Sequence, residues 1–163
     1  KTDRLWLRDS GPIFLVNKNN KKKTLLNFKF NAWSKYKNFR KDNKINNYIS
    51  RYLNIESILP KKVNSKKFER VVMEGGAFDN NGSGSILLTR ECLLSRKQER
   101  NKGFKKIDYE NLFSKYLNAK NFIWLNKGIE GDDTHGHVDY IARFVKSNKI
   151  FLAYENNKKD KNY

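Results

Sequence analysis

Two stretches of the chain place apolar side chains on one face of a helix. In each stretch they stand at positions i, i+3, i+4, i+7 and i+8, the spacing of an amphipathic α-helix. We predict helices around these positions, with Asp42 and Asp108 as N-caps. Both stretches end in Tyr-Leu-Asn, at 52–54 and 116–118. The apolar positions are Ile45, Tyr48, Ile49, Tyr52 and Leu53, and then Tyr109, Leu112, Phe113, Tyr116 and Leu117.

Short apolar runs separated by polar turns predict β-strands on both sides of each helix. A strand, a turn and a second strand precede each helix, and a short strand follows it. The predicted unit is therefore ββαβ, and the predicted fold class is α/β. The predicted strands are Ile13 to Val16, Thr24 to Phe30, Ile58-Leu59, Ser85 to Thr89, Phe122 to Leu125, Ile141 to Val145 and Ile150 to Tyr154.

The same elements recur with a fixed period. Asp9, Glu74 and Asp139 stand 65 residues apart, and each begins a segment that reaches a Phe four or five residues later. A period of this kind is typical of a repeated supersecondary module. Equivalent carboxylates in a symmetric array converge on its axis, where their oxygens match the forked N–H groups of a guanidinium. The modules fall at about residues 9–73, 74–138 and 139–163 of a single partial domain, residues 1–163.

Composition leaves two classes of function open. Lys and Arg total 35 against 17 Asp and Glu, and the formal net charge of +18 suits a basic module that binds nucleic acid or another polyanion. The excess is mostly Lys and lies in scattered runs such as 18–23 and 96–106, which favours a solvated surface. One Cys excludes an internal disulfide and, with two His, a cysteine-rich zinc site, and it fits a cytoplasmic setting. No apolar run is long enough to span a bilayer.

Five motifs then stand in a characteristic order along the chain. Together they resemble the agmatine deiminase family, which also takes in the Porphyromonas-type peptidylarginine deiminases. The resemblance implies the pentein fold, an α/β propeller of five ββαβ modules, of which about two and a half would be present. The motifs are Trp6 to Pro12, Asn27 to Trp33, Glu74 to Gly76, Glu91 to Ser95 and Asp132 to Asp139.

The resemblance also implies a reaction and a set of roles. A Cys thiolate attacks the guanidinium carbon, and the guanidinium is hydrolysed to a ureido group and ammonia without a metal or organic cofactor. Asp9 and Asp139 would hold the guanidinium nitrogens, and His137 would shuttle protons. Glu74 would support His137 or line the site. Trp6 would line the pocket beside Asp9.

Cys92 is the only thiol, yet its position argues against a catalytic role. It follows the second strand of a module and is flanked by Leu, which predicts a buried structural residue on the outer side of the module. The resemblance places the nucleophile in a Gly-rich segment beyond Tyr163. We therefore expect a chain that lacks the opening and closing modules and is inactive alone, either a fragment of a full deiminase, which we favour, or a truncated gene product. His135, one residue out of phase with His137, is expected to bond only locally.

The expected activity is hydrolysis of an amidine C–N bond. Agmatine would give N-carbamoylputrescine in putrescine biosynthesis, and peptidyl or free arginine would give citrulline. The sequence does not choose among these substrates, because they share the guanidinium. The expected partner is this small molecule rather than nucleic acid or a membrane. The resemblance leaves a homo-oligomer of the full-length protein open.

Overall fold

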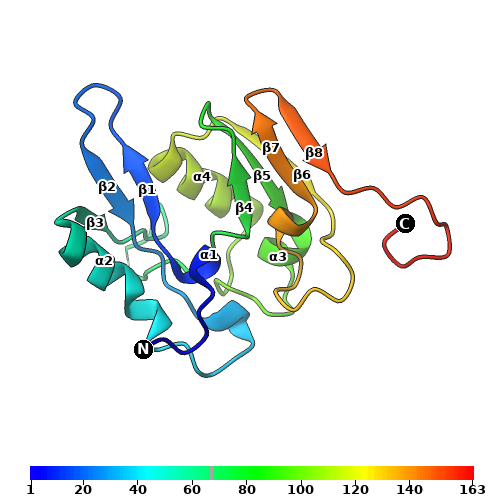
Figure 1. Ribbon diagram of the computed structural model, residues 1–163, viewed down its shortest axis with the longest axis horizontal. Helices are drawn as coiled ribbons and strands as arrows, with labels where there is room; N and C mark the ends of the chain where they lie inside the picture. Colours follow the sequence, from blue (N-terminus) through cyan, green and yellow to red (C-terminus); the bar gives the residue numbers. More distant parts are fainter. Residues whose placement is uncertain (67) are drawn as a thin grey trace.

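The computed structural model describes residues 1–66 and 68–163, and its strands form two three-stranded sheets and one hairpin (Figure 1). In the first sheet, β1 (Ile13–Val16) pairs antiparallel with β2 (Lys23–Leu26), which pairs parallel with β3 (Glu56–Ile58). A parallel pair needs a crossover. Here helix α2 (Ile45–Leu53) lies in the connection between β2 and β3.

The second sheet repeats this arrangement. β4 (Phe78–Asn80) pairs antiparallel with β5 (Ser85–Thr89), which pairs parallel with β6 (Asn121–Leu125) after helix α4 (Lys106–Leu117). The predicted ββαβ order is therefore present in both sheets. The remaining elements are the hairpin β7 (Ala142–Lys146) and β8 (Lys149–Leu152), the short helices α1 (Leu7–Ser10) and α3 (Arg90–Leu94), and the 3-10 turns η1 (Ala32–Ser34), η2 (Asp42–Lys44) and η3 (Val138–Tyr140).

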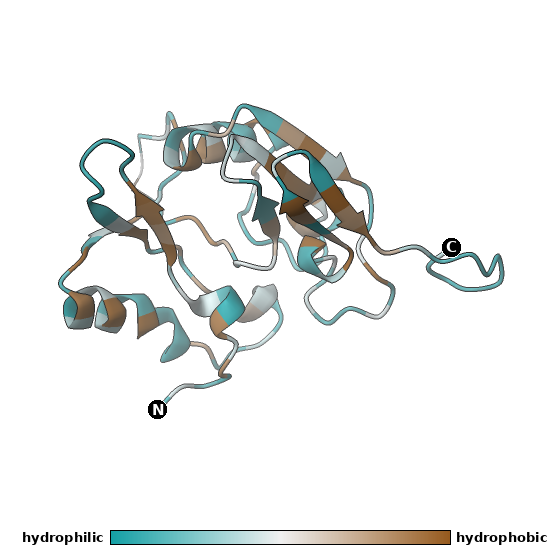
Figure 2. Ribbon diagram, turned by 45° about the horizontal axis from the view of Figure 1, so that its top comes forward, coloured by the Kyte–Doolittle hydropathy of each residue, from teal (hydrophilic) through white to brown (hydrophobic). Residues whose placement is uncertain are grey.

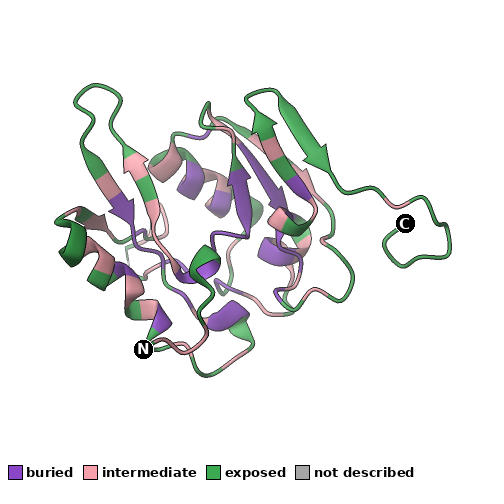
Figure 3. Ribbon diagram, viewed as in Figure 1, coloured by how far each residue is buried: buried purple, intermediate pink, exposed green. Residues whose placement is uncertain are grey.

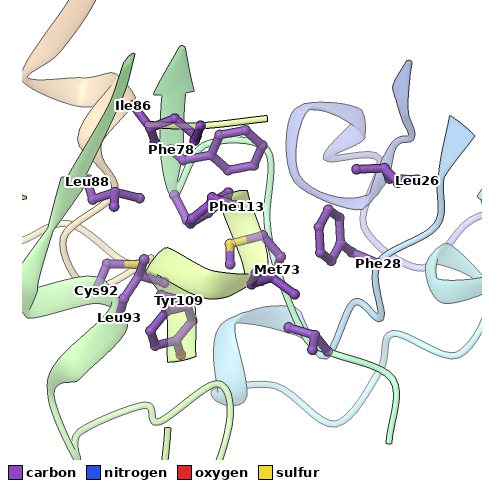
Figure 4. Close-up of a cluster of buried hydrophobic side chains, with 14 residues drawn as sticks. Leu26, Phe28, Met73, Phe78, Ile86, Leu88, Cys92, Leu93, Tyr109 and Phe113 are labelled. Atoms are coloured by element: carbon purple, nitrogen blue, oxygen red, sulfur yellow. The ribbon is translucent and has the colours of Figure 1, made fainter. Parts of the chain in front are cut away.

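The main hydrophobic core joins the two sheets. Figure 4 shows Phe28 on the side of the first sheet and Phe78 and Phe113 on the side of the second, with Met73 between them. The rings of Phe78 and Phe113 lie 5.0 Å apart in a tilted arrangement. Each fully buried side chain of this size contributes roughly 1.5–3 kcal/mol. The core thereby fixes the loops between the sheets, where the polar residues discussed below lie.

The two predicted helices form, but they pack differently (Figures 2 and 3). Tyr109, Leu112 and Phe113 of α4 are buried, as the apolar spacing predicts. In α2, by contrast, Tyr48 and Tyr52 are 64% and 89% exposed, because no described element covers that face of the helix. Of the described helices, none combines the length and the apolar character needed to cross a membrane.

Both predicted N-caps are wrong. α2 begins at Ile45 after the 3-10 turn that contains Asp42, and the buried Asp42 carboxylate instead accepts the backbone N–H of Asp3 at 2.8 Å. α4 begins at Lys106, so Asp108 is its third residue, and Asp108 accepts the backbone N–H of Lys105 at 2.8 Å. A carboxylate at this position still satisfies a free N–H at the start of the helix.

Several strand ends also differ from the prediction. The strand expected over Thr24 to Phe30 ends at Leu26, and the chain beyond it makes only a single parallel bridge from Lys29 to Val72. The ladder stops there because β3, its partner, ends at Ile58. The last two strands are displaced by one or two residues from the predicted bounds, and all four residues of β8 are exposed.

Candidate active site

Three predicted site residues meet around the glycine of one tight turn. α1 supplies Asp9, and η3 together with the residue before it supplies Asp139 and His137. A Cβ atom built on Gly76 would lie 2.4 Å from His137 Nδ1, 2.8 Å from Asp9 Oδ1 and 3.0 Å from Asp139 Oδ1. Because contacts this short are not tolerated, only glycine lets the three groups approach so closely.

Asp9 is buried and held on both oxygens. Its Oδ1 accepts the backbone N–H of Gly76 at 3.0 Å, and its Oδ2 accepts the indole N–H of Trp33 at 2.9 Å. Burial raises the pKa of Asp9 above its usual range, although His137 and these hydrogen bonds oppose the increase. Arg8, the residue before Asp9 in the chain, pairs with Asp139 rather than with Asp9.

His137 lies between two carboxylates. Its Nδ1 is 3.7 Å from Asp9 Oδ1, and its Nε2 is 3.6 Å from Glu74 Oε2. These separations are longer than full hydrogen bonds, and we describe them as ion pairs. Burial alone would lower the pKa of His137, but its contacts with Cys92 and Glu74 raise the pKa well above its ordinary value. The raised pKa favours the protonated form of the buried ring.

Glu74 is completely buried and paired with Arg100, which sequence reasoning missed. Arg100 Nε lies 3.2 and 3.3 Å from the two Glu74 oxygens, and its other nitrogens donate to the carbonyls of Gln98 and Thr134. Burial raises the pKa of Glu74, but Arg100 and His137 outweigh it and bring the pKa below its usual range. Arg100 stands in a run of basic residues, and nothing in that run distinguishes it from its exposed neighbours.

Asp139 is the most accessible of the acids. Arg8 Nε lies 3.3 Å from its Oδ2, and Arg143 lies 3.9 Å from the same oxygen. His137 and Asp139 do not lie on an extended strand, because Val138–Tyr140 is a 3-10 turn. The two residues still reach one point because the Asp139 backbone N–H donates to the carbonyl of Gly76 at 3.3 Å.

Asp132, for which the sequence predicted no role, holds the segment before His137 in place. Asp132 Oδ2 accepts the backbone N–H groups of Gly136 and His137, at 2.9 and 3.0 Å, and Asp132 Oδ1 accepts that of Thr134 at 2.8 Å. Burial would raise the pKa of Asp132, but these hydrogen bonds lower it overall. The Asp-x-Thr spacing of an Asx turn was the available signal.

Cys92 is buried, as predicted, but its predicted place on the outer side of the module is wrong. It lies in α3, where its backbone N–H donates to the side chain of Thr89, and it is 1% exposed. The ligand-type atoms of Glu74, Cys92 and His137 all lie within 4.8 Å of one another. Such a set suits zinc in principle. Here the guanidinium of Arg100 already supplies the positive charge beside Glu74.

The remaining predicted residues lie at the edge of this group. Trp6 is 56% exposed, and its ring meets the buried ring of Trp33 edge-on at 6.5 Å. His135 is not in the group: its Nε2 lies 3.2 Å from Ser95 Oγ, and Glu91 is 4.0 Å from its Nδ1. Trp6 and Asp139 are therefore the most exposed of the predicted site residues.

Known proteins include clear relatives of this chain. The family model for Porphyromonas-type peptidyl-arginine deiminase matches residues 1–163. The chain belongs to this family. A curated relative from Latilactobacillus sakei, provisionally named as an agmatine deiminase, is 36% identical over 163 residues and includes 97% of this chain.

Solved structures of the family have the same fold. Agmatine deiminase of Enterococcus faecalis superposes with a TM-score of 0.83 at 29% identity and covers 95% of this chain. C. jejuni agmatine deiminase with substrate bound superposes with a TM-score of 0.81 at 30% identity and covers 97%. The chain spans 42% of the L. sakei relative, 41% of the E. faecalis structure and 44% of the C. jejuni structure. It therefore corresponds to part of these proteins.

Proposed function

We propose that the whole protein, meaning this chain with any further sequence its gene encodes, hydrolyses the guanidinium of agmatine. The products would be N-carbamoylputrescine and ammonia. The observation that carries the proposal is the convergence of Asp9, His137 and Asp139 around Gly76, with Glu74 behind His137. Agmatine is favoured over arginine because the relatives cited above carry agmatine deiminase names.

In this proposal the acids recognise the cation. Asp9 and Asp139 approach Gly76 from different elements, and each would accept N–H donors from a different edge of the guanidinium. Arg8 now lies against Asp139, and its side chain is half exposed. The substrate cation would displace Arg8 from Asp139. Trp6 would form the wall of the entrance.

His137 would supply the protons. A thiolate attacks the guanidinium carbon and a C–S bond forms; the C–N bond then breaks, and the imidazolium gives its proton to the departing ammonia. Water next attacks the same carbon, His137 takes a proton from it, and the C–S bond breaks to release the ureido product. The raised pKa of His137 suits the first step, because it favours the protonated ring that this step requires.

We propose that the thiolate comes from outside this chain. Cys92 is buried behind His137 in the hydrophobic core, which favours a structural role. We further propose the five-module propeller of the family for the whole protein, a cytoplasmic location, and a place in putrescine formation. The polyanion-binding alternative has less support, because Asp9 and Asp139 converge with His137 on Gly76, an arrangement that suits a small cation.

The test is a substrate panel with the whole purified protein. Agmatine, free arginine and an arginine peptide are incubated separately, and ammonia and the ureido product are measured. We expect equal amounts of ammonia and N-carbamoylputrescine from agmatine, and less product from the other two. A folded whole protein that releases neither product from agmatine would contradict the proposal.

A further inference from the structure

The turn that carries Trp33 has an unusual backbone. Ala32, Trp33 and Ser34 have φ values of 50°, 59° and 53°, so three consecutive residues other than glycine are left-handed. L-residues rarely adopt this conformation even singly, and it persists only where the surroundings enforce it. The result is that the buried Trp33 ring directs its N–H at Asp9 Oδ2.

Polar contacts hold the turn in this conformation. Asn31 Oδ1 accepts the backbone N–H of Ser34 at 3.0 Å, and Ser34 Oγ donates to the carbonyl of Glu99 at 2.8 Å. The side-chain amide of Gln98 donates to the Trp33 carbonyl at 3.1 Å. The turn is thereby tied to the segment that leads into Arg100.

Aromatic side chains fix the ring itself. Three rings meet the Trp33 indole edge-on, and this arrangement is favourable for aromatic pairs. The ring therefore has little freedom to turn its N–H away from Asp9. The three rings are those of Phe30, Tyr36 and Trp6, with centroids at 5.6, 5.9 and 6.5 Å.

We propose that Trp33 is a positioning residue, which orients the Asp9 carboxylate toward the guanidinium through its indole N–H. The inference rests on the proposed function and deepens it. Asp9 is faced by His137 at 3.7 Å, by the backbone N–H of Gly76, and across Gly76 by Asp139, with Glu74 beyond His137.

Because these neighbours act on the pKa of Asp9, the proposal predicts a change in the pH dependence of activity. Burial raises the pKa of Asp9, Glu74 raises it further, and His137 and the Trp33 N–H lower it. Removing the indole N–H should therefore raise the pKa of Asp9. The carboxylate would then lose its charge at a higher pH, and the acid limb of kcat/KM, which reports groups of the free enzyme, would move upward.

The experiment compares Trp33→Phe with Trp124→Phe in the whole protein. Each change removes one indole N–H from a carboxylate, since Trp124 of β6 donates to Glu110 of α4 at 3.0 Å. For Trp33→Phe we expect the acid limb to move up by about one pH unit, with a fall in kcat/KM of about tenfold below it. For Trp124→Phe we expect no movement of the limb.

A second measurement does not depend on a variant that has to fold. In wild-type protein labelled with ¹⁵N at the indole nitrogens, the Trp33 resonance should titrate together with the acid limb. A folded, active Trp33→Phe protein with an unchanged limb would overturn the inference, as would a Trp33 resonance that does not titrate. If wild-type protein does not turn over agmatine, the proposed function is wrong, and the Trp33 titration alone decides whether the indole senses Asp9.

Discussion

Gly76→Ala adds one methyl group at the point where the candidate site residues meet. The new Cβ would lie 2.4 Å from His137 Nδ1 and 2.8 Å from Asp9 Oδ1, whereas ordinary contact begins at 3.4 Å. One of the groups must therefore retreat by about 1 Å, and a displacement of that size in a catalytic site costs on the order of a hundredfold in rate. Overpacking should also cost about 1–3 kcal/mol of stability.

The assay separates the two effects. We would measure kcat/KM for agmatine and the urea midpoint in the whole protein, with Gly82→Ala as the control. A Cβ at Gly82 meets nothing within 4 Å, but the residue has φ +69°, so the substitution should lower stability without reaching the site. A folded Gly76→Ala protein with wild-type kcat/KM would refute the claim that these groups act together on the substrate.

Three further outcomes are expected. Arg100→Gln should lower the free energy of unfolding by about 3–5 kcal/mol, because buried Glu74 would lose its closest cation and keep only His137 at 3.6 Å. A loss below about 1 kcal/mol in urea denaturation would contradict this. Cys92 should react slowly with a thiol reagent in native protein and rapidly in urea, since it is 1% exposed. Rapid labelling of the native protein would show that the thiol is accessible and contradict this prediction. The pKa of His137 is raised in the folded state, so the protonated ring stabilises the fold. This contribution is complete below the unfolded-state pKa and is lost as pH rises through the folded-state pKa. Unfolding free energy should therefore fall above neutral pH, and an equal slope in His137→Gln would refute the assignment.

The repeat was predictable because its signals are local. The apolar spacing of the two helices and the strands beside them follow from side-chain period, and the structure contains both ββαβ units. The sequence was less informative about which helix side chains are buried, because tertiary packing determines this. The apolar spacing of α2 and α4 is the same, yet Tyr48 is exposed whereas Leu112 at the equivalent position is buried, since α4 packs into the main core.

The site was predictable to the extent that motifs carry it. Asp9, His137 and Asp139 were selected from their motifs, and the structure places them around Gly76. Arg100 was missed, because the sequence of a basic run does not distinguish a buried arginine from an exposed one.

Two further site features depend on tertiary structure. The position of Cys92 was misjudged, because α3, which turns its thiol toward His137, was not expected. The left-handed turn at Trp33 contains no glycine, so the sequence gives no sign of its conformation.

The central claim is that His137 transfers protons to and from a guanidinium held by Asp9 and Asp139. The most direct measurement follows ¹³C-guanidino agmatine by NMR in the whole protein, as wild type and as His137→Asn. The account predicts conversion to the ureido carbon by wild type. It predicts that His137→Asn still broadens the agmatine signal by binding but forms no product. A folded His137→Asn protein that converts agmatine at the wild-type rate would contradict the account.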